Sequence, residues 1–262
     1  MSATSSFKYL ALAEDGQKFS RSDRFDLAVH SWVGFKRASN QDSSGISVGK
    51  SGELLTAVAD GMGGHAGGDL ASKTAIEITF AEFERETNVS FASRFSTVPD
   101  QVLGQLADIE RESPDMTGLG TTFSGIHIDG SEATIVHIGD SRIYRLRAGK
   151  LDRLTTDHTL VQQQVDAGWI SKDQAFGHRD KHVLLKALTT MERTKPDLLT
   201  VTVEAGDRYL LTSDGVHDQI PEAVIAETLS DAALQGVIER LDQLVRDAGA
   251  PDNETIVLID IK

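Results

Sequence analysis

The chain has 262 residues, and its 26 Lys and Arg against 40 Asp and Glu give a formal net charge of −14 at pH 7. Binding along a nucleic acid needs a surplus of cationic side chains, so this composition excludes a general nucleic-acid coat, and acidic partners are disfavoured. The absence of cysteine removes disulfides, thiolate zinc sites and cysteine nucleophiles, and it fits a cytoplasmic protein. No run approaches about 18 apolar residues, so we expect no membrane partner.

The first 24 residues contain no apolar stretch of signal-peptide length, and we expect residues 1–24 to form a polar N-terminal arm. Residues 25–262 contain no repeat or Pro/Ser-rich linker, which predicts a single domain. Alternating apolar and polar residues over 25–33 predict a half-buried strand, and 54–59 predicts a second.

Helical spacing of small and apolar residues predicts helices over 70–81 and 102–109, after the glycine-rich segment GMGGHAGG. The sequence ATIVHIGDSRIYRLRAGKLDRLT indicates strands and a hairpin that turns at 148–150. The more polar segment 157–195 predicts a flap-like insertion. Apolar runs at 209–212 and 256–259 are typical of strands covered on both faces, and 234–248 predicts a helix that Gly249 and Pro251 close.

Aspartates stand at the ends of four apolar strands, at positions 60, 140, 214 and 252. If the last strand runs antiparallel to the others, these carboxylates meet at one sheet edge, where their repulsion requires a cation. Carboxylates without cysteine or paired histidine suit Mg²⁺ or Mn²⁺ better than Zn²⁺. An aspartate beside a glycine is also a common turn residue, but its recurrence at several strand ends favours a site.

Seven segments of the chain carry a resemblance that covers nearly everything from residue 25. They are RASNQDS (37–43), ADGMGGHAGGDLAS (59–72), LGTT (119–122), GDSRIYRL (139–146), LTTDHTLV (154–161), LLTSDGVHD (210–218) and DNETIVLI (252–259). In order and approximate spacing they resemble the metal-dependent serine/threonine protein phosphatases, the PPM or type 2C family, in its bacterial branch.

This resemblance implies an α+β fold, a four-layer α-β-β-α sandwich with two central antiparallel sheets and a metal site at one end of the cleft between them. It implies two core Mn²⁺ or Mg²⁺ ions. Asp60 would bridge both, the Gly61 carbonyl would bind the first, and Asp214 and Asp252 would bind the second. Asp140 resembles the ligand of a third, weaker ion.

The resemblance also assigns residues around the metals. Arg37 resembles the phosphate clamp, because its planar guanidinium can hold two phosphate oxygens. His65 is the candidate general acid, with Met62 as the alternative, since other family members have a shorter DGH. Asp42, Gln41 and Asn253 are expected around the metal ligands.

Three places depart from the family pattern. HVLLKALTT (182–190) replaces a more usual pattern that contains Pro and Arg. Gln41 stands where many relatives have Glu, which changes a contact to metal-bound water. Glu254 occupies a normally apolar position.

The other seven histidines show no ligand-like pairing in the sequence and are expected to be structural or at the surface: His30, His127, His137, His158, His178, His182 and His217.

The implied reaction is attack by a metal-bridging hydroxide on a phosphoserine or phosphothreonine monoester. The expected partners are phosphorylated proteins, among them a cognate serine/threonine kinase and its targets, and the expected state is a monomer. The alternative is a catalytically inactive phosphopeptide-binding module of the same fold. A hydrolase of small phosphate esters or a nuclease is a further rival, although the acidic composition opposes the nuclease.

Overall fold

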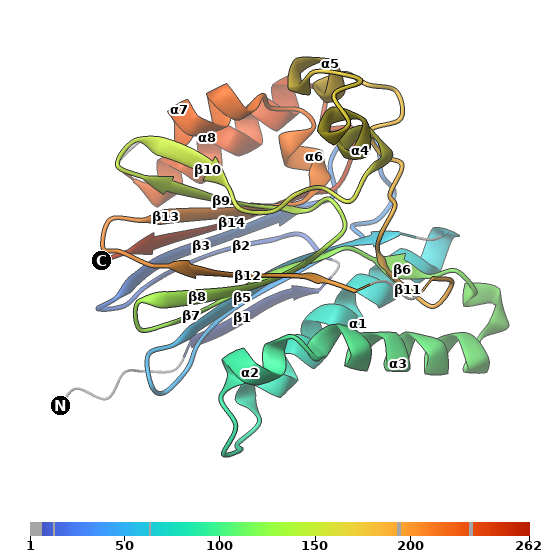
Figure 1. Cartoon of the computed structure of the whole chain (residues 1–262), viewed down its shortest axis with the longest axis horizontal. Helices are drawn as coiled ribbons and strands as arrows, with labels where there is room; N and C mark the ends of the chain where they lie inside the picture. Colours follow the sequence, from blue (N-terminus) through green and yellow to red (C-terminus); the bar gives the residue numbers. More distant parts are fainter. Residues whose placement is uncertain (1–6, 13, 63, 193–194, 231–232) are drawn as a thin grey trace.

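The computed structural model describes residues 7–12, 14–62, 64–192, 195–230 and 233–262. Two antiparallel β-sheets lie face to face, and helices cover the outer face of each (Figure 1). The structure confirms the predicted α+β, four-layer α-β-β-α sandwich.

The first sheet follows the order β1-β4-β5-β7-β8-β12, with the short strand β6 paired to β5 and the short strand β11 paired to β6. Its strands are β1 Phe7–Leu12, β4 Asp42–Val48, β5 Leu54–Met62, β6 Gly120–Thr121, β7 Phe123–Asp129, β8 Glu132–Ile138, β11 Leu188–Thr189 and β12 Asp197–Thr202. The helices α1 Gly64–Glu84, α2 Phe91–Phe95 and α3 Val98–Glu112 cover its outer face, and the short helix η1 Pro114–Met116 follows α3.

The second sheet follows the order β10-β9-β13-β14-β3-β2. Its strands are β2 Gly16–Arg21, β3 Phe25–Trp32, β9 Arg142–Arg147, β10 Lys150–Arg153, β13 Arg208–Thr212 and β14 Glu254–Ile261. The helices α6 Asp214–His217, α7 Glu222–Leu229 and α8 Leu234–Asp247 follow β13 and lie on its outer side, while α4 Leu160–Asp166 and α5 Lys172–Phe176 form the segment above α6 (Figure 1).

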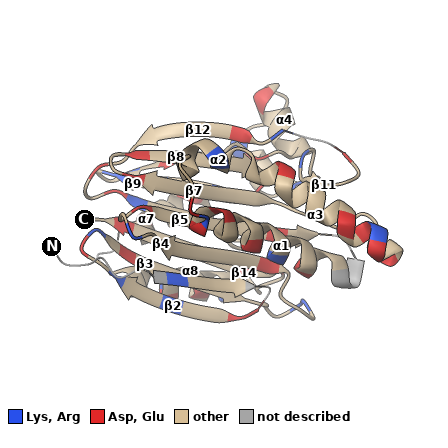
Figure 2. Cartoon of the chain, turned by 90° about the horizontal axis from the view of Figure 1, so that it is seen from below, with Lys and Arg blue, Asp and Glu red and all other residues tan. Residues whose placement is uncertain are grey.

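Three apolar cores hold these layers together. One lies between the two sheets, one between the first sheet and α1–α3, and one between the second sheet and α7–α8. The strands are mostly uncharged along their length, and charged residues gather toward their ends and on α1 and α3 (Figure 2). Among the described residues, no helix combines the length and apolar character needed to cross a bilayer.

The expectation of a polar arm over 1–24 is wrong for two segments. β1 pairs with β4 in the first sheet, and β2 pairs with β3 in the second. Both are edge strands, so their burial is partial and the alternation in their sequence is weak. Tyr9 packs against the core between the sheets, whereas Leu10 packs against the core under the helices.

Most expected elements are present, and several extend beyond their expected bounds. The helix expected over 70–81 begins at Gly64, inside the glycine-rich segment. The hairpin of β9 and β10 turns through Ala148 and Gly149, which both have positive φ, as a type I′ turn requires. The helix α8 ends before Gly249, whose φ of 97° fits a left-handed helix cap.

Candidate metal centre

The strand order brings the strand-end aspartates to one edge of the sandwich. β13 runs antiparallel to β14, so Asp214 leaves one strand where Asp252 leads into the other. In the first sheet, Asp60 on β5 lies opposite Asp42 on β4. β8 runs parallel to β5 because both pair antiparallel with β7, so Asp140 follows β8 at the same edge. The predicted convergence is therefore present.

Two glycines allow the chain to pass close to itself at this edge. A Cβ atom on Gly61 would lie 2.0 Å from the carbonyl oxygen of Gly68, at the start of α1. A Cβ atom on Gly215 would lie 1.9 Å from the carbonyl oxygen of Asn253. No other residue type fits either position without a shift of the backbone. The glycine-rich motif thus serves close packing of β5 on α1 beside Asp60.

The carboxylates at this edge raise one another's pKa. Burial, and then the charges of Asp42, Asp214 and Asp140, raise the pKa of Asp60 well above its usual value. Burial and the charge of Asp214 also raise the pKa of Asp140 and of Asp252. Among the described residues, the carboxylates of Asp60 and Asp140 receive no hydrogen bond. These groups are destabilised as anions, which a bound cation would reverse.

Asp42 lies behind this edge and is almost fully buried. Its Oδ2 accepts a hydrogen bond of 2.6 Å from the Ser213 hydroxyl, which links the two sheets, and its buried Oδ1 has no partner among the described residues. Burial raises the pKa of Asp42 to about 7, although the bond from Ser213 acts in the opposite direction. This contact of Ser213 could not be predicted from the sequence, because only the fold brings Ser213 to Asp42.

Arg37 extends over the aspartate edge from an exposed loop. Its guanidinium lies 2.6 Å from Asp252 Oδ2, and its side chain is 48% exposed. Asn253 fixes this loop, because its amide donates to the carbonyl oxygens of Val33 and Ser39 and its Oδ1 accepts from the backbone N–H of Gln41. Asn253 therefore acts on the Arg37 loop, a contact that the sequence motif did not predict.

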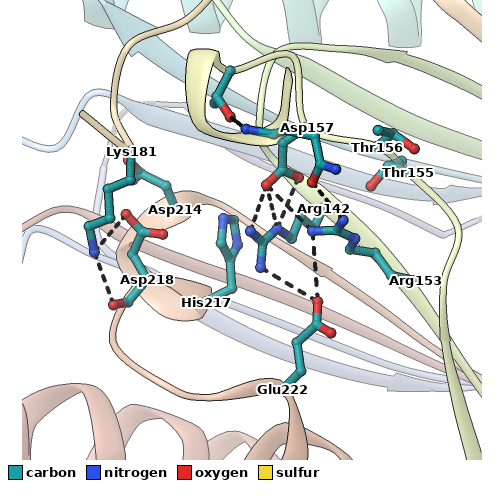
Figure 3. Close-up of polar contacts among 12 residues, drawn as sticks. Arg142, Arg153, Thr155, Thr156, Asp157, Lys181, Asp214, His217, Asp218 and Glu222 are labelled. Atoms are coloured by element: carbon teal, nitrogen blue, oxygen red, sulfur yellow. Dashed lines mark hydrogen bonds and ion pairs between the residues drawn. The ribbon is translucent and has the colours of Figure 1, made fainter. Parts of the chain in front are cut away.

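Beside Asp214 lies a cluster that was not predicted from the sequence. His182 Nδ1 lies 3.5 Å from Asp214 Oδ2 and 3.5 Å from Asp218 Oδ2. Lys181 pairs with Asp218 at 3.1 Å (Figure 3). His182 lies at the surface, as expected, and its two carboxylate neighbours were not predicted. The i, i+4 spacing of Asp214, which begins α6, and Asp218, which directly follows it, was the available signal, but His182 comes from the distant 157–195 segment.

The base of that segment is tied to the second sheet. Arg142 on β9 donates to both oxygens of Asp157, at 2.6 to 3.1 Å, and Arg153 lies 3.5 Å from the same carboxylate (Figure 3).

The side chain of His65, the expected general acid, lies outside the described residues, while Met62 is the last residue of β5.

The donor set fits hard divalent ions. Asp60, Asp140, Asp214 and Asp252 provide carboxylate oxygens, and Gly61 provides a backbone carbonyl at the same edge. The described cations beside these carboxylates are few, with Arg37 on Asp252 and a histidine at Asp214. An excess of oxygen ligands over neighbouring cations suits Mg²⁺ or Mn²⁺.

Comparisons with known proteins agree with this chemistry. A profile of the Protein phosphatase 2C family matches residues 36–249. The chain is 37% identical over 234 residues to the serine/threonine protein phosphatase PstP of Mycobacterium tuberculosis, an alignment that covers 89% of this chain and 44% of PstP. The chain thus spans less than half the length of that relative. It is 32% identical to the protein phosphatase PhpP of Streptococcus pneumoniae, over 90% of this chain and 97% of PhpP.

Solved structures give the same result. The crystal structure of the M. tuberculosis phosphatase PstP matches with a TM-score of 0.83 and 35% identity, covering 91% of this chain and 99% of that structure. The PstP catalytic domain in complex with two manganese ions matches with a TM-score of 0.81 and 35% identity, over 91% of this chain and 98% of that structure.

Proposed function

The chain belongs to the protein phosphatase 2C family of metal-dependent serine/threonine protein phosphatases, and we propose that it hydrolyses phosphoserine and phosphothreonine monoesters of proteins at the aspartate edge. One observation carries the proposal: Asp60, Asp140, Asp214 and Asp252 converge on one edge, and the described part of the chain brings too few cations there to balance them. The inactive, phosphopeptide-binding alternative has no support, because every expected carboxylate is present at that edge.

We propose that two ions are held by Asp60, the Gly61 carbonyl, Asp214 and Asp252, and that Asp140 contributes to a weaker third. The two manganese ions of the PstP complex support this assignment. Bound divalent ions lower the pKa of water and offset phosphate charge, so no protein nucleophile is needed. Either Mn²⁺ or Mg²⁺ fits the oxygen ligands.

The protein's own groups position the substrate. Arg37 is half-exposed at the edge, so its guanidinium can hold two phosphate oxygens of an incoming monoester. Asn253 keeps the loop that carries Arg37 in place. Asp42, held by Ser213, supports Asp60 from behind through the pairing of β4 and β5. His65, with Met62 as the alternative, stays our prediction for the group beside the leaving oxygen.

We further propose that the 157–195 segment helps to select the protein substrate, because it brings His182 and Lys181 to the edge next to Asp214. Exchange of this segment with that of a relative should change phosphopeptide preference and leave small-ester hydrolysis intact. We also propose that the substrates of the enzyme include a cognate kinase and the targets of that kinase. The enzyme would act as a monomer in the cytoplasm.

The test is hydrolysis of a phosphothreonine peptide by the purified protein with Mn²⁺, with Mg²⁺ and with EDTA. We expect turnover that requires the metal and is lost in Asp214→Asn. Tight peptide binding without turnover would instead support the binding module. Faster turnover of free small esters than of phosphopeptides would support the small-ester hydrolase.

A further inference from the structure

A second group of metal-ligand side chains lies on the other face of the second sheet, under α8. His30 comes from β3, Glu254 from β14 and Asp242 from α8. His30 lies opposite Ile256, so Glu254 is its diagonal neighbour on the next strand, two residues away on the same face. That face packs against α8 (Figure 1).

The atoms of this group approach one another without forming hydrogen bonds. His30 Nε2 lies 3.5 Å from Asp242 Oδ1 and 3.6 Å from Glu254 Oε1. The side chain of Glu254 is fully buried, and neither of its oxygens, nor His30 Nε2, has a hydrogen-bond partner among the described residues. A buried carboxylate without a partner is costly, so the arrangement requires an explanation.

The spacing matches ligands around a metal ion. Ligands about 2.0 to 2.1 Å from a tetrahedral ion lie about 3.3 to 3.4 Å from each other. The two distances from His30 Nε2, 3.5 and 3.6 Å, are close to this value and too long for good hydrogen bonds. One donor atom from each of the three elements lies within 4.8 Å of the other two.

We propose that His30, Asp242 and Glu254 bind a transition-metal ion of the Zn²⁺ class, in a site separate from the aspartate edge. An imidazole ligand favours Zn²⁺ over Mg²⁺, and a water molecule can complete the coordination from the side of Asp242, whose side chain is 22% exposed. The ion would connect α8 to β3 and β14. Its ligand on β14, Glu254, lies two residues after Asp252 in the chain.

The charges around the site favour a cation. Asp242 and Glu254 contribute two carboxylates, and the nearby cation is Arg246, which donates to both oxygens of Asp242 at 2.8 and 2.9 Å. Burial lowers the pKa of His30, although Asp242 and Asp15 oppose this, so the imidazole is neutral and able to bind a metal at neutral pH. Arg246 also stacks on Trp32, which fixes its position.

The competing state contains no ion and a protonated Glu254. Burial, together with the charge of Asp242, raises the pKa of this carboxyl to about 8, so a proton could neutralise it at pH 7. Protonation would neutralise Glu254 but would still give it no hydrogen-bond partner among the described residues. A bound metal ion would instead be coordinated by both Glu254 and His30. The two states differ in zinc content.

The test measures zinc bound per chain after dialysis of the full-length protein against buffered Zn²⁺, by mass spectrometry of the metal. We expect Glu254→Gln and His30→Gln each to bind about one ion fewer than the wild type. Glu254→Val is a second variant, which fits the apolar surroundings of β14 and should also lose that ion. Circular dichroism reports whether each variant is folded.

His127→Gln is the matched control. His127 is also buried, with an Nε2 that has no partner among the described residues, but it lies in the first sheet and packs on Phe83 and Phe91. This variant should bind as much zinc as the wild type. Wild-type zinc content in folded Glu254→Gln and Glu254→Val would overturn the proposal. The readout does not depend on turnover, so its outcome is independent of the proposed phosphatase activity.

Discussion

The carboxylates at the two ends of the second sheet differ in their hydrogen-bond partners. At the end near the C-terminus of the chain, Asp207 accepts two bonds of 2.6 Å from Arg147, one from the backbone N–H of Glu204 and one from the Tyr209 hydroxyl. At the other end of the same strands, the described partners of Asp252 are Arg37 and the backbone N–H of Asn253, and His182 lies 3.5 Å from Asp214.

The same pattern holds for the neighbouring pair. Arg208 begins β13 and pairs with Asp260 on β14 through two bonds, at 2.6 and 2.7 Å. Burial alone would raise the pKa of Asp207, but the bonds from Arg147 outweigh it and lower the pKa. At the aspartate edge, the pKa of Asp252 in the second sheet is raised, as are those of Asp60 and Asp140, which the first sheet brings to the same edge. The contrast separates carboxylates whose charge is balanced by arginines of the protein from carboxylates that repel one another.

The largest effect should come from Asp214→Asn. Asp214 lies at the centre of the unbalanced charges, so we expect the loss of a ligand there to lower kcat at least about 10³-fold. Without metal, the variant should melt at the wild-type temperature or above it, because one repelling charge is removed. Phosphopeptide turnover and thermal unfolding measure both effects. Retention of most activity would show that Asp214 is not a ligand.

Arg37→Ala should have the next largest effect. Loss of the guanidinium removes its bonds to phosphate, and we expect kcat/KM to fall about 10²-fold. Arg37→Lys should recover only part of this loss, because an ammonium cannot bind two oxygens in one plane. Steady-state kinetics on a phosphothreonine peptide measure both variants. Equal kinetics for wild type and Arg37→Ala would remove Arg37 from the phosphate site.

Asp140→Asn should slow turnover less, about 10-fold, because Asp140 is expected to bind only the weaker ion. Binding of the two core ions should persist. Turnover over a range of Mn²⁺ concentrations tests this, and a loss as large as that of Asp214→Asn would place Asp140 among the core ligands.

Asp207→Asn should leave turnover unchanged and reduce stability. It breaks charge-assisted bonds in a buried site, so we expect about 1 to 3 kcal/mol less free energy of unfolding. Because the folded pKa of Asp207 is lowered, its contribution is complete above the ordinary value and is lost as the pH falls through the folded value. Urea unfolding at neutral pH should therefore show a larger difference between wild type and variant than unfolding in acid.

Much of the fold and the site could be predicted from local sequence. Apolar runs that end in aspartate indicated the strands and their shared edge, and the role of these aspartates as metal ligands stays a prediction. The edge strands β1 and β2 escaped prediction because partial burial weakens alternation. Ser213, His182 and Asp242 escaped because their partners are distant in the chain, and only the fold brings them together.

The most direct test is calorimetric binding of Mn²⁺ to metal-free wild type, Asp60→Asn and Asp207→Asn. If unbalanced carboxylates mark the metal centre, Asp60→Asn should lose the binding of about two core ions, whereas Asp207→Asn should bind Mn²⁺ as the wild type does. Unchanged Mn²⁺ binding in Asp60→Asn, or an equal loss in both variants, would contradict the account.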